Sequence, residues 1–399
     1  MVGVRAGERE RIEGLANWRG RLGVEKLFLR HRGAGRLRYA LAKRGDGRCV
    51  FLGEDNLCVI HREFGLEAKP LACQMYPFVL TPVGGKWHVG LRFDCPAVVE
   101  NAGEGLARYG KELARLGQAI ETAELAALAV PEVWRGQRVR AERFEQLNEM
   151  LVGIAGSDAM GMQERLLWLW RFVEQLRRVR WGRLEKGGEE DFAGLVGMLK
   201  GGTLAETTRG DAAGAVSRRG RGLLGQVFWL LCQPAEVVTG ERVGIWREMV
   251  RRLGLWGAWR RLRGTTGPLP AVREDWPECD LAELEGSFGD WPGEVQEVVG
   301  RWLTVRLAGL GYCGRNFYGY SMVEGAESLL LGAVTMGWVM RVAAVRGRRR
   351  ELVRADAVEA VLTVDGNLGY GSAFSFGPAR LRLRALADEL GGWIERYCG

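Results

Sequence analysis

The sequence predicts a mostly α-helical protein with a small, cysteine-rich α+β metal-binding module near its N-terminus. Half of the eight cysteines lie between residues 49 and 95, among short apolar runs and turn residues. Beyond that stretch, apolar residues recur at helical spacing in one segment after another. The length of 399 residues allows two or three domains. We therefore expect a cysteine-cluster module over 1–100 and a helical domain over 101–399, with a subdivision near 264–290 where prolines accumulate.

The module is expected to combine one helical segment with two hairpins. Residues 5–44 favour helix, with breaks at glycines. Residues 48–60 indicate a β-hairpin, because two apolar runs flank a Gly-Glu-Asp-Asn turn composition. A second hairpin is indicated over 78–93, around a Pro-Val-Gly-Gly turn. These hairpins would place the cysteines at strand ends and turns.

The remaining chain is predicted to consist mostly of helices. The clearest lies over 162–181, where Leu166, Leu169 and Val173 recur on one face. The uncharged run Ser328–Met340 is shorter than the roughly 20 residues that a membrane span needs, so we expect a buried helix there. Further helices are expected over 98–119, 141–154, 223–231, 242–262 and 293–310, and loops over 183–190, 201–221 and 264–280.

Cys49, Cys58, Cys73 and Cys95 are the candidate metal ligands, at the spacing C-x8-C-x14-C-x21-C. The N-terminus has no apolar leader, so we expect a cytoplasmic protein whose thiols are kept reduced and bind metal rather than form disulfides. Thiolates are soft ligands that suit zinc or an iron–sulfur cluster such as 4Fe-4S. No tight C-x2-C knuckle is present, and spacing alone leaves open four buried cysteines that act as small hydrophobic residues.

The residues around these cysteines carry a family resemblance. They read Cys49-Val50-Phe51-Leu52, Leu57-Cys58-Val59-Ile60, Lys69-Pro70, Cys73, Tyr76-Pro77-Phe78 and Cys95-Pro96. Together they resemble the YkgJ-type cysteine-cluster family, described as zinc- or iron-chelating, and within it the flagellin lysine N-methylase (FliB-like) branch. The resemblance implies that Cys49, Cys58, Cys73 and Cys95 bind metal. It also implies methyl transfer from S-adenosylmethionine to lysine side chains of a protein substrate.

One departure from the family pattern concerns the N-terminus. Members of the family usually open with a C-x-x-C-x-x-C-C type cluster, whereas this chain has no cysteine before Cys49. We therefore expect that the chain starts downstream of that cluster and carries only part of the ligand set. A looser resemblance continues through Asn316-Phe317-Tyr318-Gly319 and Asp356-Ala357-Val358, and assigns no catalytic residue.

Two other features are weaker candidates for a site. Residues 309–314 match G-x-G-x-x-G, but the preceding segment is expected to be helical, whereas a dinucleotide- or S-adenosylmethionine-binding loop follows a buried strand. His61 and His88 lie in the cysteine region, where either could be a metal ligand or a donor that supports one. We favour polar residues at the surface or half-buried. The sequence shows no Ser-His-Asp, paired-carboxylate or P-loop motif.

Charge and composition leave three functions open. The net charge of +8 permits nucleic-acid partners, although the excess of Arg over Lys is typical of a GC-rich genome. We expect no membrane partner, because no spanning segment is predicted. The first function is a metal-containing protein-lysine N-methyltransferase, the second is a non-catalytic protein with a structural zinc site, and the third, ranked last, is an Arg-rich nucleic-acid-binding protein.

Overall fold

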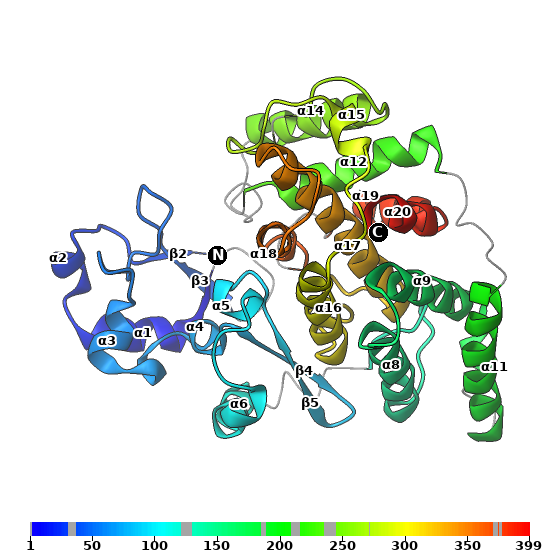
Figure 1. The fold of residues 1–399 in the computed structure, drawn as a ribbon. Coiled ribbons are helices and arrows are strands. Elements are labelled where there is room, and N and C mark those ends of the chain that lie inside the picture. The colour runs from blue at the N-terminus through cyan, green and yellow to red at the C-terminus, as the bar shows by residue number, and fades with distance from the viewer. Residues whose placement is uncertain are drawn as a thin grey trace. The chain divides into compact units, whose positions relative to one another are not determined.

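The protein is mostly helical, with two small sheets, which confirms the coarse fold class (Figure 1). A computed structural model describes residues 2–30, 37–120, 130–184, 189–208, 216–234, 245–270, 272–369, 374 and 377–399. The chain forms two compact units, unit 1 with Met1–Phe78 and Glu104–Leu125, and unit 2 with Val79–Gly103 and Ala126–Gly399. The first division therefore falls at Phe78 and not near residue 100, and residues 264–290 lie inside unit 2 without a further boundary.

Unit 1 contains a three-stranded sheet, in the order β1-β3-β2, and short helices. Their bounds are β1 Gly3–Arg5, α1 Ala6–Leu15, α2 Trp18–Leu22, β2 Phe28–Arg30, β3 Leu37–Leu41, α3 Val59–Phe64, the 3-10 helix η1 Leu66–Ala68, α4 Leu71–Met75, the 3-10 helix η2 Leu106–Tyr109 and α6 Gly110–Ala119.

The helix expected over 5–44 is wrong beyond Leu22. There the chain forms β2 and β3, which pair antiparallel with Phe28 opposite Leu41. On its other edge β3 pairs with β1, where Val4 lies opposite Tyr39. Pairing of β3 on both of its edges outweighs any local preference for helix.

The hairpin expected over 48–60 is also wrong. Cys49 and Cys58 each form one isolated bridge, Cys58 with Leu52, so the chain between them is a closed loop without strands. The chain then enters α3 at Val59, which was expected in a strand. Like the expected hairpin, the loop returns the chain to the region of Cys49, and Cys58 packs against the same core.

The core of unit 1 is small and centres on Trp18 and Phe51. Their rings meet edge to face, with 5.3 Å between the centroids. The indole nitrogen of Trp18 donates a hydrogen bond of 2.6 Å to the Ile12 carbonyl, so its buried N–H is satisfied. The other buried members are Val4, Leu27, Leu41, Ala42, Val50, Val59 and Ile60.

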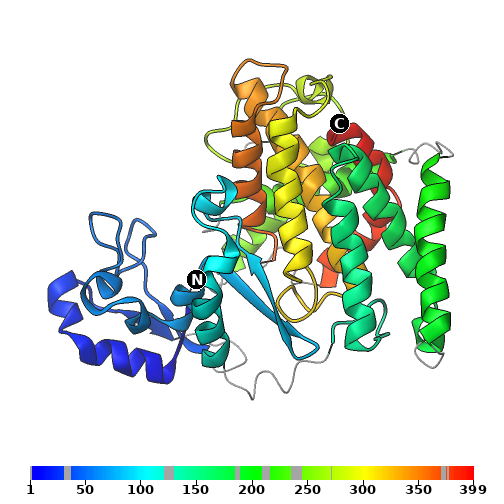
Figure 2. The same ribbon diagram turned by 60° about the horizontal axis from the view of Figure 1, so that its bottom comes forward.

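Unit 2 is built from helices and one hairpin (Figures 1 and 2). The bounds of its elements are β4 Phe78–Val83, β5 Lys86–Leu91, α5 Pro96–Val99, α8 Ala141–Ala155, α9 Met162–Arg178, α10 Trp181–Leu184, α11 Glu189–Thr208, α12 Arg218–Cys232, α14 Ile245–Leu262, α15 Leu281–Glu285, α16 Gly293–Ala308, α17 Met322–Arg346, α18 Arg354–Asp365, α19 Gly377–Ala387 and α20 Leu390–Tyr397.

Most expected helices of unit 2 are confirmed, as is the β4–β5 hairpin. Gly84 and Gly85 make its turn with φ of 61° and 76°, which favours glycine. Two expectations are wrong. The helix over 98–119 is interrupted around Gly103 and divides into α5, η2 and α6. The described residues of the loop expected over 201–221 are helical apart from 216 and 217, because α11 continues to Thr208 and α12 starts at Arg218, and 209–215 lie outside the described residues.

Helix α17 is the centre of unit 2, and Figure 2 shows it among α16, α18 and the C-terminal helices. A capping box starts the helix, in which the Ser321 hydroxyl accepts from the Glu324 backbone N–H. A side chain at Gly325 or Gly337 would collide with a backbone carbonyl of Tyr312 or Tyr397. By length and composition α17 could cross a membrane, but 94% of its most apolar window is buried in the protein, as in a core helix.

A buried polar cluster joins the helices α16 and α18 to the segment that follows the β4–β5 hairpin in unit 2. One Asp365 carboxylate oxygen accepts from the Trp302 indole at 2.8 Å, and the other accepts from the Phe93 backbone N–H at 2.8 Å. Arg306 lies 3.4 Å from the same carboxylate and is itself 2% exposed. Burial raises the pKa of Asp365, and Arg306 opposes that rise.

Candidate functional site

Unit 1 brings together three of the four predicted ligands. Cys49 lies at the start of the closed loop, Cys58 lies at its end, directly before α3, and Cys73 lies inside α4. All three are half-buried and pack against the core around Trp18 and Phe51. Three segments of the sequence thus present their thiols to one small apolar core.

The three thiols are close enough to influence one another electrostatically. Burial raises the pKa of Cys73 to about 12, Lys69 lowers it, and the charges of Cys49 and Cys58 raise it further. Burial likewise raises the pKa of Cys49, a backbone hydrogen bond from Phe51 lowers it, and Cys58 raises it again. Burial thus favours the protonated thiols of Cys49 and Cys73, and a bound metal ion would favour their thiolates instead.

Cys95 belongs to unit 2, where it lies directly before α5 and makes no capping hydrogen bond with its side chain. The sequence had placed it in the same module as the other three, because only the spacing along the chain was visible. Within the parts of the chain that the structure describes, no group of three or more His, Cys, Asp and Glu side chains has the geometry of a metal site. The thiols of unit 1 fit a thiophilic metal by their chemistry. In the described residues, however, they do not form even a three-ligand group with metal-site geometry.

Glu8 supports the position of Cys73, a role that the sequence did not indicate. One of its carboxylate oxygens accepts from the Leu71 backbone N–H at 2.7 Å, in the first turn of α4. The other accepts from the Arg5 backbone N–H at 2.8 Å. Glu8 is half-buried and joins α1 to the helix that carries Cys73.

The remaining cysteines and histidines take no part in this cluster. Cys232, Cys313 and Cys398 are fully buried in unit 2, where burial raises the pKa of each, and Cys279 is half-buried. His61 is exposed on α3, as we favoured. In unit 2, the His88 Nε2 atom lies 3.7 Å from a Glu145 carboxylate oxygen, beyond hydrogen-bond distance. His31 lies outside the described residues.

A pocket of about 350 Å³ in unit 2 is the second candidate site. The pocket lies beside the loop that connects α16 to α17. This loop contains the G-x-G-x-x-G match. As expected, a helix precedes this loop, so the loop is not the strand-to-helix turn that binds dinucleotides. The side chains of interest around the pocket are Glu132, Arg138, Arg315, Asn316 and Tyr320.

The loop beside the pocket has a fixed conformation. The Gly314 backbone N–H donates to the Tyr320 carbonyl at 2.8 Å, and the Gly319 N–H donates to the Gly314 carbonyl at 2.9 Å. Gly314 and Gly319 have φ of 69° and 67°, and the non-glycine residues Leu310 and Tyr318 also have positive φ. Such conformations cost energy and are found preferentially at functional sites.

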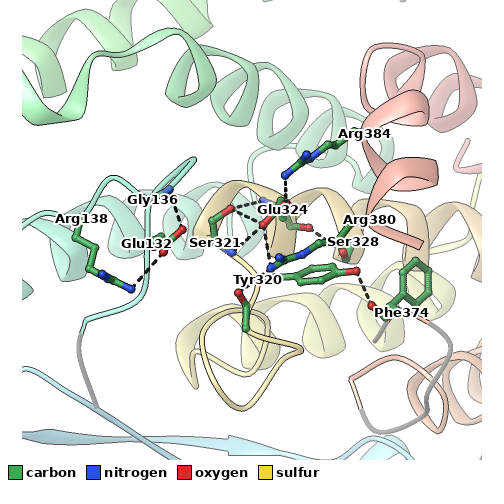
Figure 3. A network of polar contacts seen from close by, with 11 residues as sticks. Glu132, Gly136, Arg138, Tyr320, Ser321, Glu324, Ser328, Phe374, Arg380 and Arg384 are labelled. Atoms are coloured by element: carbon green, nitrogen blue, oxygen red, sulfur yellow. Dashed lines mark hydrogen bonds and ion pairs between the residues drawn. The ribbon is translucent and has the colours of Figure 1, made fainter. Parts of the chain in front are cut away.

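Charged groups surround this pocket in a connected arrangement (Figure 3). Glu132 accepts from Arg138 at 3.2 Å and from the Gly136 backbone N–H at 2.9 Å. The Tyr320 hydroxyl donates to the Phe374 carbonyl at 2.7 Å, and burial raises its pKa to about 12, so the phenol stays protonated at neutral pH. Glu324, one turn into α17, is nearly buried.

Glu324 joins α17 to α19. Its carboxylate lies 3.1 Å from the guanidinium of Arg384 and 3.5 Å from that of Arg380 (Figure 3). Arg380 also lies over the Tyr320 ring, 4.6 Å from its centroid. The wall of the pocket that holds Tyr320 is therefore held by two helices that are distant in sequence.

Comparison with known proteins gives no assignment, since no family model, curated protein or solved structure matches the chain.

Proposed function

We propose that the chain is a metal-binding cysteine-cluster protein in which Cys49, Cys58 and Cys73 hold zinc or an iron–sulfur cluster. The observation that supports it is the packing of these three half-buried cysteines against the one core of unit 1. Cys95 stays a predicted ligand on the basis of the sequence alone. A bound metal would join the loop between Cys49 and Cys58 to α4, and metal binding in such small modules contributes directly to folding free energy.

The first experiment is anaerobic purification followed by metal analysis and a visible absorption spectrum. We expect either iron with labile sulfide and a brown colour, or one colourless zinc ion. Cys58→Ala and Cys73→Ala should each abolish metal retention. Cys279→Ala is the matched control, because that thiol is half-buried like the ligands but lies in unit 2. Full retention of metal in both ligand variants, or a wild-type chain without metal, would contradict the proposal.

We also propose, as the resemblance implies, that the chain transfers methyl groups from S-adenosylmethionine to protein lysines, with the donor in the unit 2 pocket. The Arg138 guanidinium suits the carboxylate of the donor, and the Glu132 carboxylate suits its ribose hydroxyls or its ammonium group. The target lysine must be neutral to attack the methyl group, so apolar surroundings must lower its pKa.

Calorimetric titration with S-adenosylmethionine tests this second proposal independently of the metal. We expect saturable binding that weakens about tenfold or more in Glu132→Gln or Arg138→Gln, because each removes a charge-assisted hydrogen bond. Glu274→Gln, which changes an exposed carboxylate away from the pocket, should bind like the wild type. A chain that retains metal but shows no binding would support the alternative, a non-catalytic protein with a structural zinc site.

A further inference from the structure

Helix α14 exposes a stripe of large apolar side chains. Met249, Val250, Leu253 and Trp256 are 45%, 65%, 61% and 55% exposed. Their spacing along the sequence places them on one face of the helix. A single exposed leucine needs no explanation, but four adjacent large side chains on one face indicate a surface that is covered by something else.

The opposite face of α14 is firmly packed, so the stripe is not the result of a loosely attached helix. Ala258 and Leu262 are buried, and Leu262 packs so closely on α12 that no side chain would fit at Gly225. In the same way Gly254 of α14 lies directly against Trp229 of α12. Figure 1 shows α14 beside α12 in unit 2.

A basic pocket of about 750 Å³ lies at the C-terminal end of the stripe. Trp256 belongs to both, and Arg260 lies 5.5 Å from the centroid of its ring. The buried Nε atom of Arg263 has no hydrogen-bond partner. The guanidinium groups around the pocket come from Arg218, Arg260, Arg261 and Arg263.

These four cations are not neutralised by the described part of the chain. Within it, none of the four forms an ion pair, whereas many other arginines of unit 2 are paired with carboxylates, such as Arg221 with Glu285 at 2.8 Å. A second copy of the chain is a poor partner for this surface, because a twofold contact pairs the surface with itself and no residue that lines the pocket is a carboxylate that could neutralise the arginines. The stripe and the pocket together require a partner that is both apolar and anionic.

We propose that the α14 surface, formed by the apolar stripe and the basic pocket, binds the surface of an anionic phospholipid bilayer. Aliphatic and tryptophan side chains on one helix face insert at the boundary between headgroups and acyl chains, and nearby arginines attract lipid phosphates. Only Trp256 of the stripe lines the pocket, and the other three side chains form an outward face that suits a flat partner better than a peptide held in a groove. We expected no membrane partner because the sequence predicts no membrane-spanning segment. Binding to the surface of a bilayer does not require a spanning segment.

Co-sedimentation of the full chain with vesicles tests this proposal. We expect binding to vesicles of phosphatidylcholine mixed with phosphatidylglycerol, weaker binding at high salt, and little binding to phosphatidylcholine alone. Leu253→Glu should weaken binding at least about tenfold, because a charge replaces an inserted side chain. Leu381→Glu is the matched control, since Leu381 is 65% exposed in α19 but lies outside the stripe.

The basic part of the surface is tested by the double variant Arg260→Gln and Arg261→Gln. Each arginine near an anionic membrane contributes about fivefold in affinity, so the double variant should lose on the order of 25-fold. Arg48→Gln with Arg62→Gln changes the net charge equally in unit 1 and should bind like the wild type. Circular dichroism checks that each variant folds, and Val250→Glu replaces Leu253→Glu if the latter does not.

Three results would overturn the proposal. The first is no sedimentation with either type of vesicle. The second is binding that Leu253→Glu and Val250→Glu leave unchanged in folded protein. The third is a dimer in light scattering that Leu253→Glu dissociates while vesicles are not bound, which would show that a second copy covers the surface.

Discussion

The two units of the chain differ most in how much core supports them. The core of unit 1 comprises ten buried side chains in its described part, beside half-buried thiols. In unit 2 the helix α17 alone is buried from Met322 to Ala344, and helices surround it. Small cores supply little stability, so small units commonly depend on metals or disulfides. The thiols thus lie in the unit with the smaller core, where a metal would contribute most to stability.

The largest expected effect concerns this dependence. Replacing Cys58 and Cys73 together by Ala should unfold unit 1 selectively, because structural metal binding contributes on the order of 10 kcal/mol in small modules. Hydrogen exchange measured by mass spectrometry should show loss of protection in β1–β3 and unchanged protection in α17. Equal loss of protection in both units, or no loss in either, would contradict a selective dependence of unit 1 on the metal.

A substitution at Asp365 tests how much the buried polar cluster contributes to the stability of unit 2. Asp365→Ala should lower the free energy of unfolding by about 3–5 kcal/mol, because it removes the carboxylate that lies against the buried Arg306 guanidinium. Urea unfolding followed by circular dichroism measures this change. The exposed Asp290→Ala should change stability by less than about 0.5 kcal/mol. A similar small effect for Asp365→Ala would show that the buried cluster contributes little to unit 2.

Glu327 should make the stability of unit 2 depend on pH. It is 2% exposed, and burial raises its pKa to about 8 although Arg177, 3.6 Å away, opposes the rise. Since the folded protein holds the proton more tightly than the unfolded chain, the stability contributed by the protonated group is lost as the pH rises from about 4.5 to about 8.

Glu327→Gln removes this titration. Relative to the wild type, the variant should gain up to a few kcal/mol between pH 5 and pH 9 in parallel denaturation series. A difference between the two proteins that stays constant with pH would show that Glu327 is ionised in the folded protein throughout, paired with Arg177.

The smallest expected effect concerns the start of α17. Ser321→Ala should cost about 1 kcal/mol, because it removes the side-chain cap of the helix. The exposed Ser287→Ala is the control. Differential scanning calorimetry measures both, and equal melting temperatures for the two variants would contradict a capping contribution in unit 2.

Patterns local to one helix could be predicted from the sequence. Along α9, Leu166, Leu169, Val173 and Leu176 recur at helical spacing, and all four are buried. By contrast α11 was missed, because its glycines disfavour helix and its conformation depends on contact with α9. The strands β2 and β3 were missed for a similar reason, since each depends on its pairing partner.

The candidate metal site could be predicted only as far as the clustering of thiols along the chain. In the structure Cys49, Cys58 and Cys73 pack against one core, in line with that clustering. The clustering did not indicate that Cys95 belongs to the other unit. The support that Glu8 gives to the Leu71 backbone was equally hidden, because it joins residues 63 positions apart and depends on the folded path of the chain.

The second segment of unit 1, Glu104–Leu125, follows the first segment of unit 2, Val79–Gly103, in the sequence. In that segment, Arg115 of α6 donates to Gln74 of α4 at 3.1 Å, beside the turn that carries Cys73. A ribosome must therefore release the hairpin of unit 2 before it releases the last helix of unit 1. A gene fragment that ends at residue 100 would encode neither unit completely. Because each unit contains two separate segments of the chain, an end-to-end fusion of two genes would not produce this arrangement.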